Sequence, residues 1–375
     1  MKKIFKLPAL IVAQAVAFCC FAAGCNFGEK VNIERNSIMS DIDTAPLQQA
    51  AYESYSKAVY EEYKAVAERH TSDGELDEEN EEVQSAASDA AAKLFAYACY
   101  NERTLDKYVF FSDQTGDTDL GASGSATARR QEYYLRVNES ENTCGYRYHY
   151  TIKKVDRSSG LIAGSKGLFE SARIRMTDKT DLLYRFEGDK STIKYSDEKH
   201  PTLGVNLLEC EWKTGKDWGK PDVVMKKSGF IPPEEIHNDV INGADDDNFT
   251  VRGNIDILAE NIIKSARIIE NPDGLLVIAE IDCGIANSSE ASLKMLRKAN
   301  DSGDCKWDDL TLTFQLWNNG LFRFYYINET WSGSLKGFKG SVNSETTYKY
   351  SYSDRDCDMS AYLETLDEAK KSKEK

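Results

Sequence analysis

The sequence predicts an α+β protein in which an N-terminal helical hairpin precedes a curved antiparallel β-sheet, a half-barrel with covering helices. Apolar residues recur every three or four positions between residues 46 and 97, as they do in amphipathic helices. From residue 131 to residue 353 they alternate instead with polar residues, as in half-buried antiparallel strands. Near the end of this region, Asn319-Gly320 separates two apolar runs, which is typical of a β-hairpin.

The first residues have the order of a secretory signal peptide, predicted over residues 1–24. Basic residues precede an apolar run, Leu7–Phe21, that is too short to span a bilayer as a helix. Ala22, Ala23 and Gly24 then precede Cys25, a pattern that resembles the lipobox of bacterial lipoproteins. This resemblance implies that the Cys25 thiol carries a diacylglycerol and that fatty acyl chains hold the protein on a membrane. The alternative is an ordinary secretory signal followed by a chance cysteine.

The composition narrows the possible partners. The formal net charge is −15 at pH 7, which argues against nucleic acid or anionic lipid as a general partner. No cofactor is expected beyond the lipid on Cys25. An even number of cysteines follows it, so three disulfides are possible, but the sequence does not fix their pairing. No CxxC pair or Cys/His cluster occurs, which disfavours a zinc site. These residues are Cys99, Cys144, Cys210, Cys283, Cys305 and Cys357.

A tether and a helical hairpin are predicted next. Residues 25–45 are polar and aperiodic, as in a flexible linker. Residues 46–111 are assigned to the helical hairpin, with two apolar stripes separated by the acidic stretch 72–82. That stretch is interpreted as a solvated turn, and binding of calcium or of a basic partner is the alternative.

The sheet is predicted over residues 129–355, after a Gly/Ser/Thr-rich loop at 112–128. In its first strand Arg147, His149 and Thr151 share one face, opposite three tyrosines and an isoleucine. Pro232-Pro233 interrupts the strands, so a helical insertion is predicted near 231–264. A charged C-terminal helix or tail is predicted over 356–375.

The hairpin around Asn319-Gly320 supplies the candidate ligand surface. A two-residue type I′ loop would pair Trp317 with Phe322 and Gln315 with Phe324 on one face that mixes aromatic, hydroxyl and amide groups. This mixed face suits either an apolar ligand or a covering helix, whereas the opposite face reads as core. The residues expected to line a ligand site are Trp212, Trp317, Phe322, Phe324, Tyr326 and Trp331.

Three stretches carry a resemblance to a known superfamily: LLYRFEGDKSTIKY, GLLVIAEIDC and LTLTFQLWNNGLFRFYYINETW. In order and pattern the chain resembles the lipoprotein carriers of the LolA, LolB and LppX-like kind. This resemblance implies a half-barrel closed by helices around an apolar cavity that holds lipid. The N-terminal helical hairpin has no counterpart there. The chain also resembles uncharacterised lipoproteins of gut Firmicutes.

The motifs of catalytic sites are missing from the sequence. It contains no GxSxG, HExxH, GxGxxG or Walker motif, and its four histidines lie far apart. We therefore expect no enzyme. The leading hypothesis is a lipid-anchored protein on the extracytoplasmic face of the cell membrane or outer membrane that binds an apolar or amphiphilic ligand. The alternatives are a structural or interaction lipoprotein of the cell envelope with a solidly packed sheet and, third, a carbohydrate-binding surface.

Overall fold

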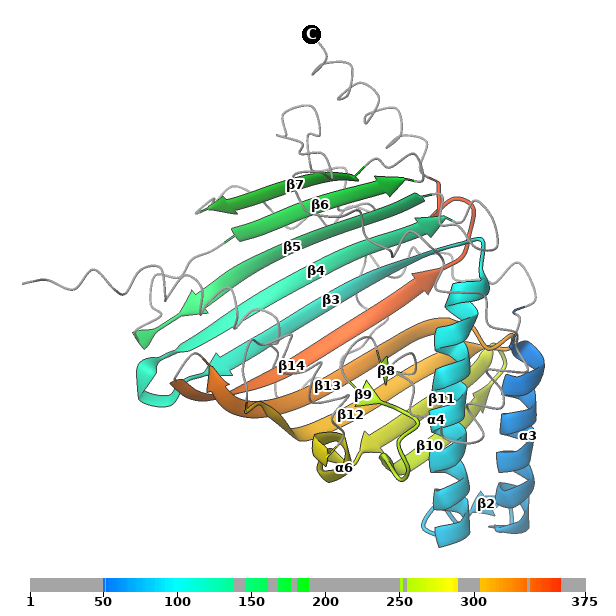
Figure 1. Ribbon diagram of the computed structural model, residues 1–375. Helices are drawn as coiled ribbons and strands as arrows, with labels where there is room; N and C mark the ends of the chain where they lie inside the picture. Colours follow the sequence, from blue (N-terminus) through cyan, green and yellow to red (C-terminus); the bar gives the residue numbers. More distant parts are fainter. Residues whose placement is uncertain are drawn as a thin grey trace, which may run out of the picture.

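The computed structural model describes residues 50, 52–137, 146–160, 168–176, 181–188, 250–251, 255–288, 304–335 and 338–358. In these residues the protein is an α+β structure made mainly of antiparallel sheet, with a helical hairpin against one face (Figure 1). The predicted signal peptide and tether lie outside the described residues, as does the predicted C-terminal tail beyond residue 358.

Ten strands form one curved and twisted sheet in the order β10-β11-β12-β13-β14-β3-β4-β5-β6-β7 (Figure 1). Each pair is antiparallel, and the two halves of the chain meet where β14 pairs with β3. The edge strands β10 and β7 do not pair with each other in the described part of the chain. The strands are β3 (Lys107–Asp119), β4 (Ser125–Val137), β5 (Tyr146–Ser158), β6 (Leu168–Met176), β7 (Asp181–Gly188), β10 (Ile263–Asn271), β11 (Gly274–Ile281), β12 (Lys306–Trp317), β13 (Phe322–Leu335) and β14 (Phe338–Ser351).

The predicted helical hairpin is present as α3 (Glu53–Arg69) and α4 (Glu81–Thr104). Asn80 caps α4 because its side-chain oxygen accepts hydrogen bonds from the backbone N–H groups of Glu82 and Val83, at 2.9 and 3.4 Å. The acidic stretch between the helices forms a short ribbon of β1 (Thr71–Ser72) and β2 (Glu75–Leu76). A tyrosine cluster that includes Tyr55 and Tyr97, with ring centroids 5.7 Å apart, packs the helices together.

Helix α4 packs against β10 to β13 and closes one half of the core. Its fully buried Phe95 ring lies 5.3 Å from Phe314, 5.0 Å from Phe322 and 5.7 Å from Tyr325. Small residues on the same helix let it approach the strands closely; those fully or almost fully buried are Ala87, Ala90, Ala91, Ala96 and Ala98. The surface of the sheet on this side is called the α4-side face below.

The helical hairpin also protects the edge strand β10. Lys64 of α3 pairs with Glu270 at 3.4 Å, and Arg267 pairs at 2.8 Å with Glu78 from the loop before α4. An exposed edge strand can pair with other chains, so an edge lined by helices and ion pairs resists aggregation.

The predicted β12–β13 hairpin is present, but its turn is not type I′. Gly320 has a φ of +80°, whereas Asn319 does not have a positive φ. The Gly320 N–H bonds to the Trp317 carbonyl at 2.8 Å, and the Asn319 side chain accepts a bond from the Leu321 N–H at 3.1 Å. The register shifts between Gln315 and Leu316 as a consequence, so Phe322 pairs with Leu316 rather than with Trp317.

Two further predictions about the secondary structure are wrong. Residues 107–111 were assigned to the helical hairpin and 112–128 to a loop, but they form β3, the short 3₁₀ turn η2 (Gly121–Ser123) and the start of β4. The small residues there are buried in the sheet, as Thr118, Ala126 and Ala128 illustrate.

The helical insertion predicted near 231–264 is also wrong in the part of that range that the structure describes. Residues 255–264 contain β9 (Ile255–Asp256), turns, and the first residues of β10. β9 pairs with β8 (Thr250–Val251) as a separate ribbon. The isoleucines of this segment favour strands, and Asn261 has a φ of +57° that breaks a helix. The rest of the insertion lies outside the described residues.

Candidate ligand-binding face of the sheet

The structure does not bring the predicted ligand-lining residues together. Phe322 and Trp331 are fully buried, and Phe322 lies on the α4-side face. Phe324 and Tyr326 are half-buried on the opposite face, because side chains alternate along β13. Trp317 is half-buried at the end of β12, where the Arg323 guanidinium lies 4.8 Å from its ring. Cys25 and Trp212 lie outside the described residues.

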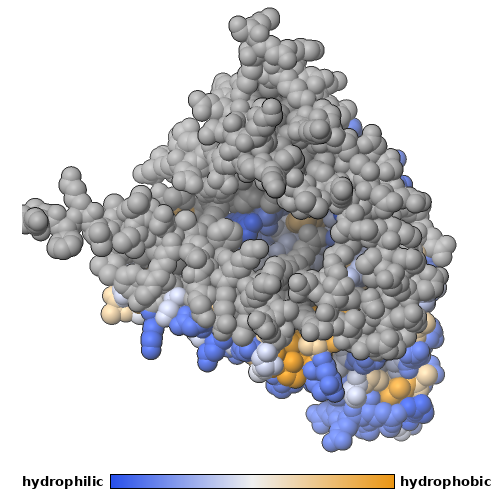
Figure 2. Space-filling view, in the orientation of Figure 1, coloured by the Kyte–Doolittle hydropathy of each residue, from blue (hydrophilic) through white to orange (hydrophobic). Residues whose placement is uncertain are grey.

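The α4-side face changes character across the sheet. Under α4 it is apolar, with Leu312 and Phe314 almost fully buried. Aromatic rings then continue beyond the helix: Tyr325 stacks on Tyr348 at 4.4 Å, and Phe110 lies 5.8 Å from Tyr348 and 5.0 Å from Tyr134. We call Tyr325, Tyr348, Phe110 and Tyr134 the aromatic strip. The described residues visible in the hollow at the centre of Figure 2 are both hydrophilic and hydrophobic.

A buried polar row crosses the same face beside the aromatic strip. Glu329 of β13 accepts a 2.9 Å hydrogen bond from the indole N–H of Trp307, and Gln114 of β3 donates to Ser344 of β14 at 3.3 Å. Burial raises the pKa of the Glu329 carboxyl above its ordinary value, although hydrogen bonds from Trp307 and Ser344 partly oppose this. A buried carboxyl on a sheet face whose neighbouring residues are polar is a candidate binding group.

A charged group follows on β4. Arg130 pairs with Glu132 at 2.6 Å, and Glu132 also accepts a 3.3 Å hydrogen bond from Ser112. Both side chains are mostly shielded from solvent, with 23% and 13% exposed. The α4-side face therefore runs from apolar, through aromatic, to charged. Such a gradient matches a molecule with an apolar chain and a polar end.

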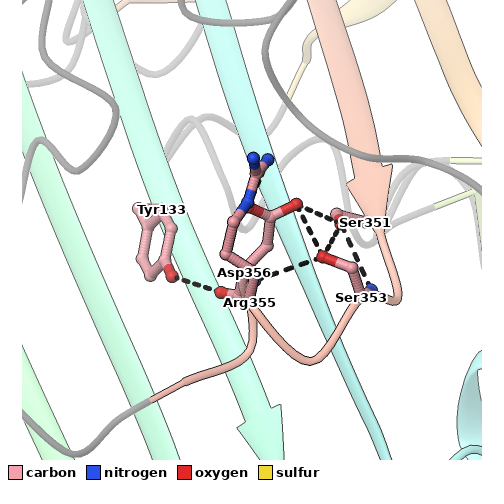
Figure 3. Close-up of polar contacts among 5 residues, drawn as sticks. All are labelled: Tyr133, Ser351, Ser353, Arg355 and Asp356. Atoms are coloured by element: carbon pink, nitrogen blue, oxygen red, sulfur yellow. Dashed lines mark hydrogen bonds and ion pairs between the residues drawn. The ribbon is translucent and has the colours of Figure 1, made fainter.

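The opposite face of β3 and β4 is closed by the turn that follows β14 (Figure 3). The Asp356 carboxylate accepts hydrogen bonds from Ser351 and Ser353, at 2.6 and 2.9 Å, and from Arg355 at 3.2 Å. The Tyr133 hydroxyl donates to the Asp356 carbonyl at 3.3 Å. Together these bonds hold the turn over β4. The arrangement fits a structural role, because the Asp356 carboxylate already accepts hydrogen bonds from Ser351, Ser353 and Arg355.

Two of the cysteines are thiols of low reactivity. Burial raises the pKa of Cys283 to about 11 and that of Cys357 to about 12, so both stay protonated at neutral pH. Cys144 and Cys210 lie outside the described residues. Across the described ranges, no group of three or more His, Cys, Asp or Glu residues could hold a metal ion. None of the helices in this part of the chain is long and apolar enough to cross a membrane.

Comparisons with known proteins do not identify a family or a function for the chain. No protein family pattern matches the chain, and no curated protein matches it significantly in sequence. Among solved structures, the chain is similar to a DUF1329 family protein from Desulfovibrio piger, with 10% identity over 72% of this chain and 97% of that one. The TM-score is 0.19, which is too low to carry an argument about fold or function.

Sequence reasoning missed the polar row and the aromatic strip, because most of their residues lie on strands that it did not predict or in positions that it assigned to the core. The two-residue period of side chains along a strand would have grouped them only after β3 had been recognised as a strand. In Tyr108–Gln114, for example, every second residue belongs to the α4-side face, and Phe110, Ser112 and Gln114 all contribute to the surface described above.

Proposed function

We propose that this protein is a lipid-anchored extracytoplasmic protein that binds an amphiphilic ligand and performs no catalysis. In this proposal Cys25 carries the lipid anchor, and the curved sheet serves as a half-barrel. The ligand lies on the part of the α4-side face beyond the helix. The observation that carries the proposal is the gradient on that face, from the apolar part under α4 through the aromatic strip to the Arg130–Glu132 pair.

The energetics favour an amphiphile over a purely polar ligand. Tyr134 and Tyr348 are the partly exposed members of the strip, and an acyl chain that covers them gains about 25 cal/mol for each Å² of apolar surface removed from water. The polar end requires hydrogen-bonding partners, because a buried polar group without them costs ~1–3 kcal/mol. Ser112, Glu132 and Arg130 lie next to the strip and can supply them.

Two tyrosines of neighbouring strands provide a matched test. Tyr348 of β14 belongs to the aromatic strip, whereas Tyr326 of β13 lies on the opposite face, and both are half-buried. The protein is purified from its membrane, and co-purified lipid is measured by native mass spectrometry. We expect Tyr348→Ala to lower the bound lipid severalfold and Tyr326→Ala to leave it unchanged. Absence of bound lipid from the wild-type protein, or equal retention by the two variants, would contradict the proposal.

The anchor is tested separately by labelling cells with a palmitate analogue. Wild-type protein is expected to incorporate the label, and Cys25→Ala is expected to abolish incorporation. An unlabelled wild-type protein would remove the anchor from the proposal without affecting the ligand site.

A second candidate function is a structural or interaction lipoprotein without a ligand. The packing of α4 favours it, because Leu94, Phe95 and several alanines of the helix are buried and the Phe95 ring contacts Phe314, Phe322 and Tyr325 of the sheet. This candidate predicts that no lipid co-purifies and that Tyr348→Ala and Tyr326→Ala behave alike.

A further inference from the structure

The backbone register gathers basic residues on the α4-side face of β4 to β7. Arg136 of β4 pairs with Arg147 of β5, which pairs with Arg175 of β6. Directly paired residues share a face of a sheet, and so do residues two positions apart on one strand. We call a line of directly paired residues that crosses neighbouring strands a row. The rows through Glu132, Tyr134 and Arg130 therefore belong to the same face as the row through Arg136. With the row through Arg136, they contain Arg130, Arg136, Arg147, His149, Lys153, Arg173, Arg175 and Arg185.

The acidic residues in these rows are fewer: Glu132, Asp181 and Glu187. The opposite face of the same strands has more apolar residues. Its rows contain Tyr133, Leu135, Tyr148, Tyr150, Ile152, Ala172, Ile174, Leu182, Tyr184 and Phe186, together with Arg129, Gln131, Lys154 and Glu170. Most of the basic residues in these rows thus lie on one face of the four strands, whereas the opposite face carries Arg129 and Lys154. This local excess of positive charge contrasts with the net charge of −15 for the whole chain.

The basic rows adjoin the aromatic strip. Tyr134, the last residue of the strip, is itself paired with His149, which is paired with Arg173. Neighbouring strands are ~4.8 Å apart, so a polar group over β5 or β6 would be only ~5–10 Å from the end of the strip. That separation is within the length of one amphiphile.

We propose that the headgroup of the amphiphile is anionic and lies over the basic rows of β4 to β7, where Arg130 and Arg136 of β4 can contact it, while its apolar chain lies on the aromatic strip. This inference rests on the proposed function and specifies the ligand class. Arginine suits the task because its guanidinium makes paired hydrogen bonds with phosphate or carboxylate oxygens. Arg136 is only 6% exposed, and in such a shielded position an ionic contact is stronger than at the surface.

Three single-chain lipids test the headgroup. The purified full-length protein is titrated with palmitoyl lysophosphatidylglycerol, which is anionic, with palmitoyl lysophosphatidylcholine, which is zwitterionic, and with uncharged monopalmitoylglycerol. We expect the anionic lipid to bind about tenfold more tightly than the other two. Raising the salt from ~0.1 M to ~1 M, which shortens the Debye length from ~10 to ~3 Å, should reduce that preference.

Two adjacent arginines of β4 provide matched variants. Arg130 belongs to the basic rows, whereas Arg129 lies on the opposite face and pairs with Asp113. Arg130→Gln should lower the preference for the anionic lipid severalfold, and Arg129→Gln should leave it intact. Arg147→Gln provides a second variant in the rows in case Arg130→Gln disturbs the fold, which circular dichroism would reveal.

The outcomes separate this inference from the proposed function. Equal binding of all three lipids would overturn the anionic headgroup and leave the proposed function standing. No binding of any lipid would overturn both. Glycerol 3-phosphate, which lacks an acyl chain, should compete poorly; if it competed as well as the lipid, the ligand would be a free phosphate compound and the amphiphile would be excluded.

Discussion

The buried carboxyl of Glu329 should make the stability of the protein depend on pH, and Glu329→Gln should remove that contribution. The residue is only 7% exposed and accepts a hydrogen bond from the indole N–H of Trp307. Burial raises the pKa of this carboxyl above its ordinary value of 4.5. The folded protein therefore keeps this proton to a higher pH than the unfolded chain does.

The sign and size of the effect follow from linkage. Between the ordinary pKa and the raised pKa, the folded state holds a proton that the unfolded state has released. In that window the free energy of unfolding falls as the pH rises, by up to about 1.4 kcal/mol per pH unit. The stabilisation is complete below the ordinary pKa and is lost as the pH rises through the folded pKa. Glutamine keeps an oxygen acceptor for Trp307 but has no proton to release.

Urea unfolding followed by tryptophan fluorescence, from about pH 4 to about pH 8, measures this contribution. Glu329→Gln should match the wild type near pH 4 and become more stable than it as the pH rises. Glu329→Ala leaves the Trp307 N–H without this acceptor and should cost ~1–3 kcal/mol at every pH. Parallel curves for the wild type and Glu329→Gln would refute the reasoning.

Three further predictions concern packing and turns. Phe95→Ala should lower the free energy of unfolding by ~3–5 kcal/mol in urea, because its ring joins α4 to the sheet. Gly320→Ala should lower the free energy of unfolding by more than ~1 kcal/mol, because an added Cβ would lie 2.8 Å from the Ser56 hydroxyl oxygen. Gly74 has a similar φ but open space around it, so Gly74→Ala should lower the free energy of unfolding only by the cost of a positive φ. Cys357 should react with a thiol reagent at neutral pH only after unfolding, and rapid labelling of the folded protein would contradict its burial.

The parts of the fold that depend on local patterns could be predicted from the sequence. The 3.6-residue period of α3 and α4 identified both helices, and the alternation on either side of Asn319-Gly320 identified the β12–β13 hairpin. The turn type could not be predicted in the same way. Asn101 of α4 donates to the Gly320 carbonyl at 3.2 Å, so a helix distant in sequence contacts the turn.

Strand β3 and the start of β4 were missed, and in β3 both faces are buried in different surroundings. Phe110 lies on the α4-side face and Phe111 on the face closed by the turn after β14, and both are buried. Apolar residues thus occur next to one another instead of alternating. The Gly, Ser and Thr residues that follow were read as a loop, although small residues also fit closely packed strands.

The candidate site, too, could be predicted from the sequence only where it depends on a local pattern. Alternation in the sequence correctly placed Arg147 and His149 on one face of their strand, as the register of β5 requires. It could not show that this face continues the one covered by α4, because that relation depends on the pairing of β14 with β3, two strands about 230 residues apart in sequence.

The central claim, an amphiphile bound on the α4-side face beyond the helix, is tested most directly by photo-crosslinking. Cells are fed a diazirine fatty acid and irradiated, the protein is purified, and the modified peptides are mapped. The account predicts cross-links to β3, β4 and β14 at residues of the aromatic strip, such as Phe110, Tyr134 and Tyr348. Label confined to the peptide that contains Cys25, or placed on the opposite face at Phe324 and Tyr326, would contradict it.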